Sequence, residues 1–275
     1  MRILGIIVLY TPDKDALNNL DNLINSKYID KVFIADNSAT KLDLYESNSK
    51  VSYNFYSENR GIAYALHDGM EYAKANDYDY ALTLDQDSKF PYDSFDSIKS
   101  YLDKYLNTKT GIVALNYNNK YKSKNGELKL KYIITSGNFI NVKAYKEIDG
   151  FNRELFIDYV DFDLCRQFYY KKYDIVVLTN YSLIQTIGNP IYKRFLFVKL
   201  KSMNPSLIRY YYRFRNLTYC YKRNKRFYLK NKIKEGITIW IMLLCEKDKC
   251  KKLKMIKLGK KDGKRGILGP YKERM

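Results

Sequence analysis

The sequence has few of the residues that build disulfides or zinc clusters. It contains one histidine, His67, and four cysteines, and no two cysteines form a CxxC pair. The spacing between these cysteines and His67 does not match that of a zinc site. We therefore expect reduced thiols in a cytosolic protein, because structural disulfides are typical of oxidising compartments.

Long apolar runs are also missing. No run reaches the roughly 18 residues that a membrane-spanning helix needs. Met1 and Arg2 lead directly into a short apolar segment, so we expect no signal peptide. The 275 residues can bury a sizeable core and suffice for one α/β domain with an appended helical region.

Acidic residues are scarce in the C-terminal third of the chain. Residues 191–275 carry 26 lysines and arginines against 5 acids, a net charge of +21, whereas residues 1–190 carry 23 against 25, a net charge of −2. We therefore expect a catalytic domain over residues 1–190, with halves 1–115 and 116–190, and a basic helical region over 191–275. A basic region suits an anionic partner, either a membrane surface or a nucleic acid.

The N-terminal half alternates between strand and helix patterns. Apolar segments predict strands at residues 2–9, 30–35, 51–56, 78–84 and 111–115. Helices are predicted between them at residues 13–25, 62–75 and 92–106. This alternation is typical of an α/β fold with a doubly wound, mostly parallel sheet.

Two carboxylates follow the predicted strand at 78–84. Asp85 and Asp87 flank Gln86 immediately after the apolar run. In open α/β sheets, ligands bind beyond the carboxyl ends of the strands. Carboxylate oxygens there suit Mg²⁺ or Mn²⁺, with a diphosphate completing the coordination shell. The alternative is a solvated turn.

The three preceding strands also end in polar residues. These are Thr11, then Asp36-Asn37, then Asn59-Arg60-Gly61. Polar ends on successive parallel strands would line one crevice. Alternatively, these residues only form turns or begin helices.

Further along the chain, Asp158, Asp161 and Asp163 lie within six residues at the start of a predicted helix. Acids are favoured there by the helix dipole, so capping alone would account for them. The functional alternative is a general base, a carboxylate partly shielded from water with a raised pKa.

The basic C-terminal region has three notable segments. Residues 209–216 interleave arginine and tyrosine, which suits phosphate or base contacts but also a helix packed on a core. A helix over 230–256 combines an apolar segment with a lysine run, so it either lies in a membrane interface or covers the protein's own core. Residues 260–271 are expected to form an extended tail, and 116–129 a loop or hairpin over the site.

Taken in order, these motifs resemble the family-2 inverting glycosyltransferases of the GT-A fold, and among them a bacterial rhamnosyltransferase-like branch. The resemblance extends over nearly the whole chain, and Leu82-Thr83-Leu84-Asp85-Gln86-Asp87-Ser88 is its most specific part. The other matching stretches are residues 36–38, 59–63, 134–137, 156–161, 209–216 and 258–266.

The resemblance implies roles for individual residues in nucleotide binding. Asp36 would bind the nucleotide base, with Thr11 and Arg60 close by. The neighbouring residues of this nucleotide-binding set are Asn37, Asn59 and Gly61. Asp85 would contact the ribose or the metal, and Asp87 would hold a divalent metal, Mg²⁺ or Mn²⁺, on the diphosphate.

It also implies roles in chemistry and acceptor binding. Asp161 would be the catalytic base, with Asp158 as its rival. Arg209 or Arg215 would stabilise the diphosphate, and Thr135-Ser136-Gly137 would border the acceptor site. Gln185 stands where the family often has a histidine that helps bind the metal, so its amide oxygen is a weaker candidate metal ligand.

The implied reaction is a single displacement from a nucleotide sugar. We expect dTDP-L-rhamnose as donor, and the alternative is transfer of galactose, galactofuranose or another hexose from a dTDP- or UDP-sugar. The expected acceptor is a lipid-linked glycan of a cell-surface polysaccharide, which places the protein in the cytoplasm at the inner membrane face. A nucleic-acid-binding module is the alternative from another class, but it does not explain the acids at the strand ends.

Overall fold

The computed structural model describes residues 1–42, 45, 47–185, 190–195 and 197–272. The chain forms two compact units, Met1–Arg153 with Asp161–Thr186, and Glu154–Val160 with Ile187–Met275. The second unit begins close to the boundary expected at residue 190. It also takes in residues 154–160, which the sequence had placed in the catalytic domain.

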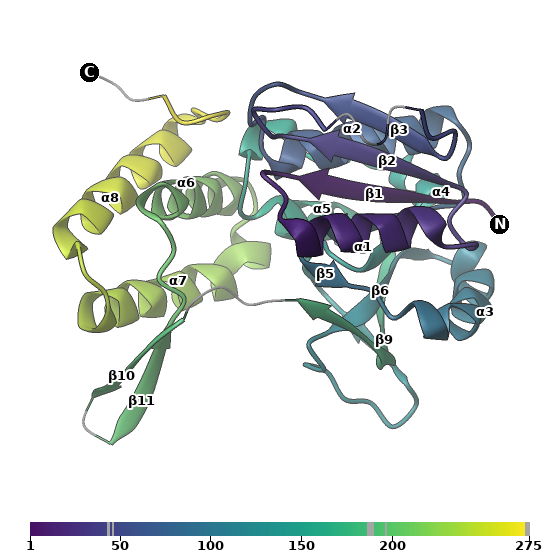
Figure 1. Ribbon diagram of the computed structural model, residues 1–275. Coiled ribbons are helices and arrows are strands. Elements are labelled where there is room, and N and C mark those ends of the chain that lie inside the picture. Colours follow the sequence, from purple (N-terminus) through teal and green to yellow (C-terminus); the bar gives the residue numbers. More distant parts are fainter. Residues whose placement is uncertain (43–44, 46, 186–189, 196, 273–275) are drawn as a thin grey trace. The chain divides into compact units, whose positions relative to one another are not determined.

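The first unit is built on a mixed sheet in the order β3-β2-β1-β4-β8-β6-β9-β5, with β7 paired to β9 (Figure 1). The first four strands in this order are mutually parallel, and they are β1 (Ile3–Leu9), β2 (Lys31–Asp36), β3 (Val51–Phe55) and β4 (Tyr80–Asp85). The remaining strands are β5 (Ser88–Lys89), β6 (Thr110–Tyr117), β7 (Glu127–Leu130), β8 (Asn138–Asn141) and β9 (Asp174–Gln185). β8 is antiparallel to both of its neighbours, whereas β6 and β9 are parallel. The predicted α/β fold with a mainly parallel sheet is thus confirmed.

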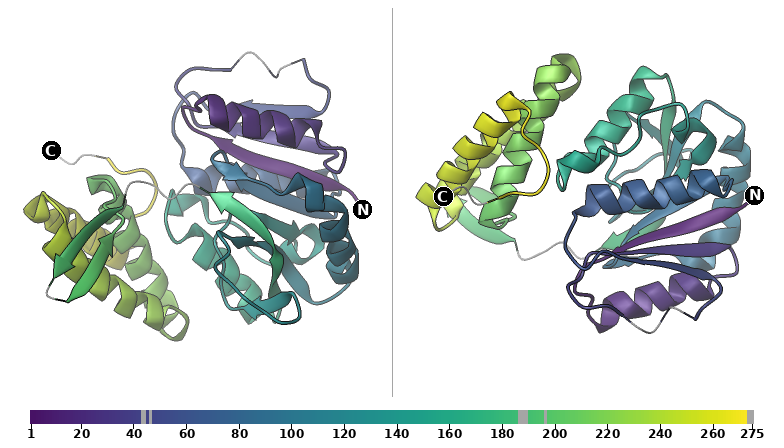
Figure 2. Two further views of the ribbon diagram at one scale, coloured as in Figure 1. Left: turned by 60° about the horizontal axis from the view of Figure 1, so that its bottom comes forward. Right: turned by 90° about the horizontal axis from the view of Figure 1, so that it is seen from above.

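Helices cover both faces of this sheet (Figure 2). The helices of the unit are α1 (Lys14–Asn25), α2 (Ile62–Ala75), α3 (Phe95–Leu106), α4 (Val142–Tyr145) and α5 (Val160–Tyr170). Gly5 in β1 lies against Leu23 of α1, and the next residue, Ile6, lies against Gly69 of α2. Successive strand residues point to opposite faces, so α1 and α2 pack on opposite sides of the sheet. Such a strand is apolar on both faces, which explains the unbroken apolar run of β1.

The second unit contains three helices and a hairpin. These are α6 (Leu207–Arg223), α7 (Lys225–Cys245), α8 (Lys249–Arg265) and the antiparallel strands β10 (Ile191–Phe195) and β11 (Val198–Ser202). The sequence did not predict the hairpin. The helix predicted over 230–256 is divided between α7 and α8, and the tail predicted from residue 260 is wrong because α8 continues to Arg265. Within the described part of the chain, no helix has both the length and the apolarity to cross a membrane.

A buried ion pair accounts for the break between α7 and α8. The Glu246 carboxylate accepts hydrogen bonds from the Tyr210 hydroxyl at 2.9 Å, from Lys252 Nζ at 2.6 Å and from the Ser202 hydroxyl. Glu246 and Lys252 are both buried. A buried charge is tolerated when it is paired and hydrogen-bonded, and these partners come from α6, α8 and β11. The network therefore holds the turn after α7 against the rest of the unit.

Helices α6 and α8 approach each other closely at two glycines. A Cβ atom at Gly259 would collide with the main-chain oxygen of Tyr211, and one at Gly263 with that of Arg215. Between them, Asp262 is buried and accepts a hydrogen bond of 2.9 Å from the Tyr211 hydroxyl. The terminal glycine motif is therefore a helix-packing motif.

We predict that Gly259→Ala and Gly263→Ala each destabilise the protein by about 1–3 kcal/mol, the usual cost of overpacking. The control is Gly236→Ala in α7, because no atom lies within 4 Å of a Cβ there. That change should stabilise the protein by about 0.5–1 kcal/mol, since alanine favours the helix. Urea denaturation measures all three, and equal stabilities for the α8 variants and the control would contradict the close packing.

Candidate functional site

The carboxyl ends of β1, β2 and β4 are tied together by hydrogen bonds. The Thr11 amide donates to Ser38 Oγ at 2.9 Å. The Tyr10 amide donates to Gln86 Oε1 at 2.8 Å, and Gln86 Nε2 donates back to the Tyr10 carbonyl at 3.2 Å. The structure thus brings together the polar strand ends that the sequence singled out.

Asn37 joins the end of β2 to the loop that begins α2. Its Oδ1 accepts from the Arg60 amide at 2.9 Å, and its Nδ2 donates to the Gly61 carbonyl at 3.4 Å. The Gly61 amide donates to Asn59 Oδ1 at 2.9 Å. Gly61 has a φ of 84°, which glycine adopts without strain. The predicted nucleotide-binding residues after β2 and β3 therefore form one connected group.

Asp36 is the most enclosed member of that group. It is fully buried and accepts from the Tyr53 hydroxyl at 2.6 Å and from the Ser38 amide at 2.8 Å. Because Ser38 in turn holds Thr11, the Asp36 carboxylate positions the polar rim that these strand ends form. Its contact with a nucleotide base stays a prediction.

Arg60 presents a partly exposed cation at this rim. Its guanidinium lies 5.4 Å from the ring centre of Tyr56 and 5.2 Å from that of Tyr64, and its Nε lies 3.2 Å from Glu58 Oε1. A hydrogen bond to the Tyr64 hydroxyl raises the pKa of Arg60 above its usual value. Such a stacked guanidinium is well suited to phosphate or base recognition.

Asp85, Asp87 and Gln185 converge on one point. Gln185 Nε2 donates to Asp85 Oδ2 at 2.9 Å and to Asp87 Oδ1 at 2.8 Å. The three residues meet because β5, which follows Asp87, pairs antiparallel with the end of β9. The pKa of the nearby Tyr117 hydroxyl is raised by burial and by the negative charges of Asp87 and Asp85. The site is therefore locally negative.

The convergence fits a divalent cation. The described residues contain no cluster of three or more His, Cys, Asp and Glu side chains with metal-site geometry. However, two carboxylate oxygens face one amide group, and rotation of that amide would present Gln185 Oε1 instead of Nε2. Three oxygen donors with open positions for a diphosphate suit Mg²⁺ or Mn²⁺. The metal roles of these residues stay predictions that the geometry permits.

The predicted acceptor residues pack directly beside Asp85. Ser136 Oγ accepts from the Asp85 amide at 3.0 Å and lies 2.7 Å from Ser88 Oγ. Thr83 Oγ1 donates to the Thr135 carbonyl at 2.6 Å, and the Gly137 amide donates to the Thr83 carbonyl at 2.8 Å. Ser136 is buried, so it also supports the turn that carries the two acids.

Asp161 and Asp163 lie in the first turn of α5, as predicted, but their surroundings differ. Asp163 is buried and accepts from Arg166 Nε at 3.0 Å and from Gln167 Nε2 at 3.1 Å. Asp161 is only half-buried. One turn further, burial raises the pKa of the Cys165 thiol to about 12, and the charges of both acids contribute. Asp163 is therefore structural, and Asp161 is the more accessible carboxylate of α5.

Asp158, the rival base, is held by a predicted diphosphate ligand. Arg209 Nη2 lies 2.7 Å from Asp158 Oδ1, and Arg209 Nε lies 2.9 Å from Oδ2. A bidentate pair of this kind is among the stronger protein ion pairs, and it stabilises the charged carboxylate. Asp158 is thus engaged in an ion pair with Arg209, while the roles of Asp158 and Asp161 stay predictions.

The prediction for Arg215 requires correction. Its side chain is fully buried and donates to the main-chain oxygens of Leu155 at 2.9 Å, Glu154 at 3.3 Å and Gly269. Asn216 Nδ2 donates to the oxygens of Leu155, Ile157 and Asp158, each at 2.8 Å. An enclosed guanidinium with these partners has no face for a diphosphate. Arg215 and Asn216 instead hold residues 154–158, a role that the sequence motif did not reveal.

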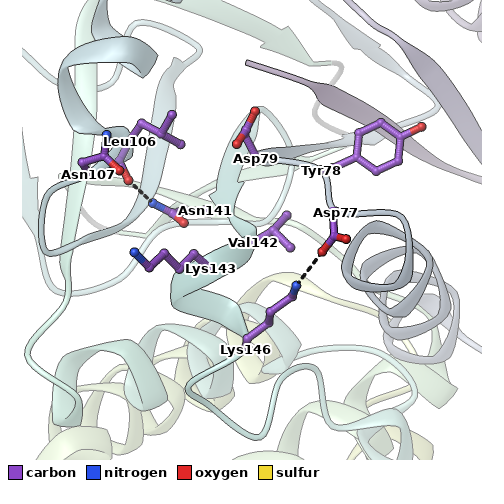
Figure 3. A pocket seen from close by; sticks show the side chains of 9 residues that line it. All are labelled: Asp77, Tyr78, Asp79, Leu106, Asn107, Asn141, Val142, Lys143 and Lys146. Carbon is purple, nitrogen blue, oxygen red and sulfur yellow. Dashed lines mark hydrogen bonds and ion pairs between the residues drawn. The ribbon is translucent and has the colours of Figure 1, made fainter.

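Two remaining features lie apart from this group. His67 Nδ1 lies 3.1 Å from the Phe151 carbonyl and does not contact the acids. A cavity of about 300 Å³ opens at the amino end of β4, where Lys146 pairs with Asp77 at 3.0 Å (Figure 3). Asp85 lies at the carboxyl end of the same strand, so this cavity lies at the opposite end of β4 from the candidate site.

We compared the chain with known proteins. No protein-family model matches the chain. The chain is 24% identical to the dTDP-rhamnosyl transferase RfbF of Shigella flexneri over 97% of both proteins.

Among solved structures, TarS of S. aureus matches with a TM-score of 0.52 at 16% identity, over 68% of this chain and 37% of TarS. GalNAc-T7 with UDP, GalNAc and Mn²⁺ matches with a TM-score of 0.56 at 11% identity, over 67% of this chain and 44% of GalNAc-T7. TarS in complex with UDP-GlcNAc matches with a TM-score of 0.53 at 12% identity, over 93% of this chain and 70% of that structure. The chain therefore spans less than half of the first two structures.

The structural matches show the GT-A fold, and the curated match extends over the full length of the chain. They confirm the resemblance to family-2 glycosyltransferases that the motifs predicted. The protein is a glycosyltransferase.

We predict that Gln185→Glu lowers the melting temperature without metal by about 2–4 °C, because three carboxylates would then repel one another. Added Mn²⁺ should raise the melting temperature of this variant more than that of the unmodified protein, since a charged ligand replaces an amide. The control is Gln86→Glu, which adds the same charge where the side chain faces the Tyr10 main chain. Equal Mn²⁺ responses of the two variants would contradict a cation site at Gln185.

Proposed function

We propose that this nucleotide-sugar glycosyltransferase transfers L-rhamnose from dTDP-L-rhamnose to a hydroxyl of a growing, lipid-linked cell-surface glycan. The convergence of Asp85 and Asp87 on Gln185, at the carboxyl ends of the parallel strands, carries the proposal. The full-length similarity to a dTDP-rhamnosyl transferase supports the choice of donor.

The nucleotide would bind along the ends of β1 to β4. Arg60 offers a stacked cation at the rim, and Thr11 and Asn37 are fixed by the hydrogen bonds that join the strand ends. Preorganised groups of this kind bind without a further ordering cost. A divalent cation held by Asp85, Asp87 and Gln185 would neutralise charge on the diphosphate.

Asp161 is the proposed base. Its carboxylate would take the proton of the acceptor hydroxyl as that oxygen bonds to the anomeric carbon. The bond from this carbon to the diphosphate oxygen would break at the same time, so the nucleoside diphosphate leaves and the configuration inverts. A positioned base accelerates such a step by roughly 10²–10⁴-fold.

A different sugar is the alternative within this function. TarS has been solved with UDP-GlcNAc and GalNAc-T7 with UDP and GalNAc, so related folds accept UDP-sugars. A UDP-linked galactose or galactofuranose is therefore the second candidate donor. The loop between β6 and β7, residues 118–126, is rich in polar and charged residues, and it would help to select the sugar.

We predict that dTDP-L-rhamnose with Mg²⁺ or Mn²⁺ raises the melting temperature of the purified protein, because a ligand of the folded state stabilises it by mass action. The rise should disappear with EDTA and in Asp87→Ala. If only UDP-sugars raise the melting temperature, the protein is still a glycosyltransferase, but its donor is a UDP-sugar and not dTDP-L-rhamnose. If no nucleotide sugar shifts the transition at any metal concentration, the proposed donor site is wrong.

We predict that Asp161→Asn retains donor binding and loses roughly 10²–10⁴-fold in turnover, the contribution of a positioned base. Asp158→Asn is the matched control, because it removes the same charge three residues before Asp161, from a carboxylate that is already paired with Arg209. Its turnover should fall much less. Single-turnover transfer rates measure both variants, and the reverse order of losses would make Asp158 the base.

A further inference from the structure

A groove opens between α7 and α8 in the second unit. Its volume is about 670 Å³. Ile239 of α7 and Leu253 and Ile256 of α8 form an apolar floor. The rim consists of five cations that lie between Lys257 and Arg265. An apolar floor beneath a cationic rim matches the two parts of an anionic amphiphile.

Among the described residues, no acidic side chain lines this groove. Asp262 belongs to the same turns of α8, but it is buried and bound by Tyr211 of α6. Burial lowers the pKa of Lys260, and the nearby charges of Lys232 and Lys264 lower it further. Cations crowded in this way repel one another, so an anion bound among them would relieve unfavourable electrostatic energy.

From residue 190 onwards, the described part of this unit exposes little negative charge, while its segment 154–160 adds the exposed Glu154 and the partly buried Asp158, which pairs with Arg209. Of the acids among the described residues from 190 onwards, Glu235, Glu246 and Asp262 are buried, and only Asp248 is exposed. The lysines and arginines there, by contrast, are mostly exposed. A surface of one sign attracts an anionic layer at long range and leads it to any local site.

Large apolar side chains are exposed beside these cations. Leu229, Ile233, Ile237 and Trp240 are between 49% and 63% exposed. Their spacing of four, four and three residues places them on one side of α7. Phe197, next to the hairpin turn, is 94% exposed. Apolar residues with a tryptophan, flanked by lysines, are typical of helices that lie in a membrane interface.

We propose that the α7–α8 groove binds a phosphorylated lipid, with the lysines of the rim on the phosphate and the apolar floor under the first carbons of the hydrocarbon chain. Bilayer phospholipids and lipid-phosphate carriers share this chemistry. The proposal concerns a second site and does not depend on the donor or on the acids around Gln185. It also revises the expected membrane contact, from the apolar and basic segments of one helix to a groove between two helices.

Co-sedimentation of the full chain with vesicles tests the proposal. Vesicles of phosphatidylcholine with and without phosphatidic acid are compared at one ionic strength. The groove variant Lys257→Gln/Lys260→Gln/Lys261→Gln/Lys264→Gln should bind the acidic vesicles about tenfold more weakly than a charge-matched control. That control, Lys247→Gln/Lys249→Gln/Lys251→Gln/Lys254→Gln, removes four exposed lysines from the turn before α8 and from its first half. Both variants alter surface side chains, and thermal melting checks that they fold.

Leu253→Gln tests the apolar floor, because it leaves every cation in place. It should weaken binding to the acidic vesicles while inorganic phosphate still competes. Equal losses in the two quadruple variants would show only general electrostatic attraction and would overturn the proposal. So would vesicle binding that Leu253→Gln leaves unchanged, or inorganic phosphate that binds the groove as tightly as the lipid does. Donor binding, measured by thermal shift, should be the same in all these variants, which separates this outcome from failure of the proposed function.

Discussion

The fully buried guanidinium of Arg215 is the interaction on which the second unit depends. A buried cation is costly unless its N–H groups are satisfied, and here they reach main-chain oxygens of two segments, Leu155 before α5 and Gly269 after α8. Together with Asn216, it fixes a segment in which Phe156, Asp158 and Tyr159 all have φ near 65°, a conformation that L-residues rarely adopt. This segment continues along the chain into α5, the helix that carries the proposed base.

The first unit solves a different electrostatic problem. Two carboxylates at the end of β4 would repel each other, and one amide group placed between them reduces that repulsion. The amide belongs to Gln185 at the end of β9, about a hundred residues after the two acids. It reaches them because β5, which directly follows Asp87, pairs with β9. Gln185 is therefore compatible with two states of the site. Without a cation its Nε2 donates hydrogen bonds to the two carboxylates, and with a cation its Oε1 would act as a ligand.

The parallel strands and the grouping of their polar ends could be predicted because they depend on local patterns. Apolar runs ending in polar residues locate parallel strands, and parallel strands place those ends on one edge. The failures concern long-range contacts. Nothing near Arg215 distinguishes a guanidinium that binds phosphate from one that binds carbonyls 60 residues away. The glycines after residue 258 indicated a tail because an isolated helix disfavours glycine, whereas contact with α6 requires it.

Ion pairs formed by buried acids explain why the surface of the second unit is so basic. Two of its few acids are buried in ion pairs, Glu235 with Arg213 and Glu246 with Lys252, each at 2.6 Å. Each such pair removes one cation and one anion from the surface, and among the described residues few exposed acids, such as Asp248 and Glu154, are left to balance the many exposed cations. The unit therefore presents its excess positive charge outward, next to apolar side chains that a soluble surface would normally bury. The excess of basic residues is visible in the sequence, and folding places it on the surface because most of the described acids beyond residue 190 become buried.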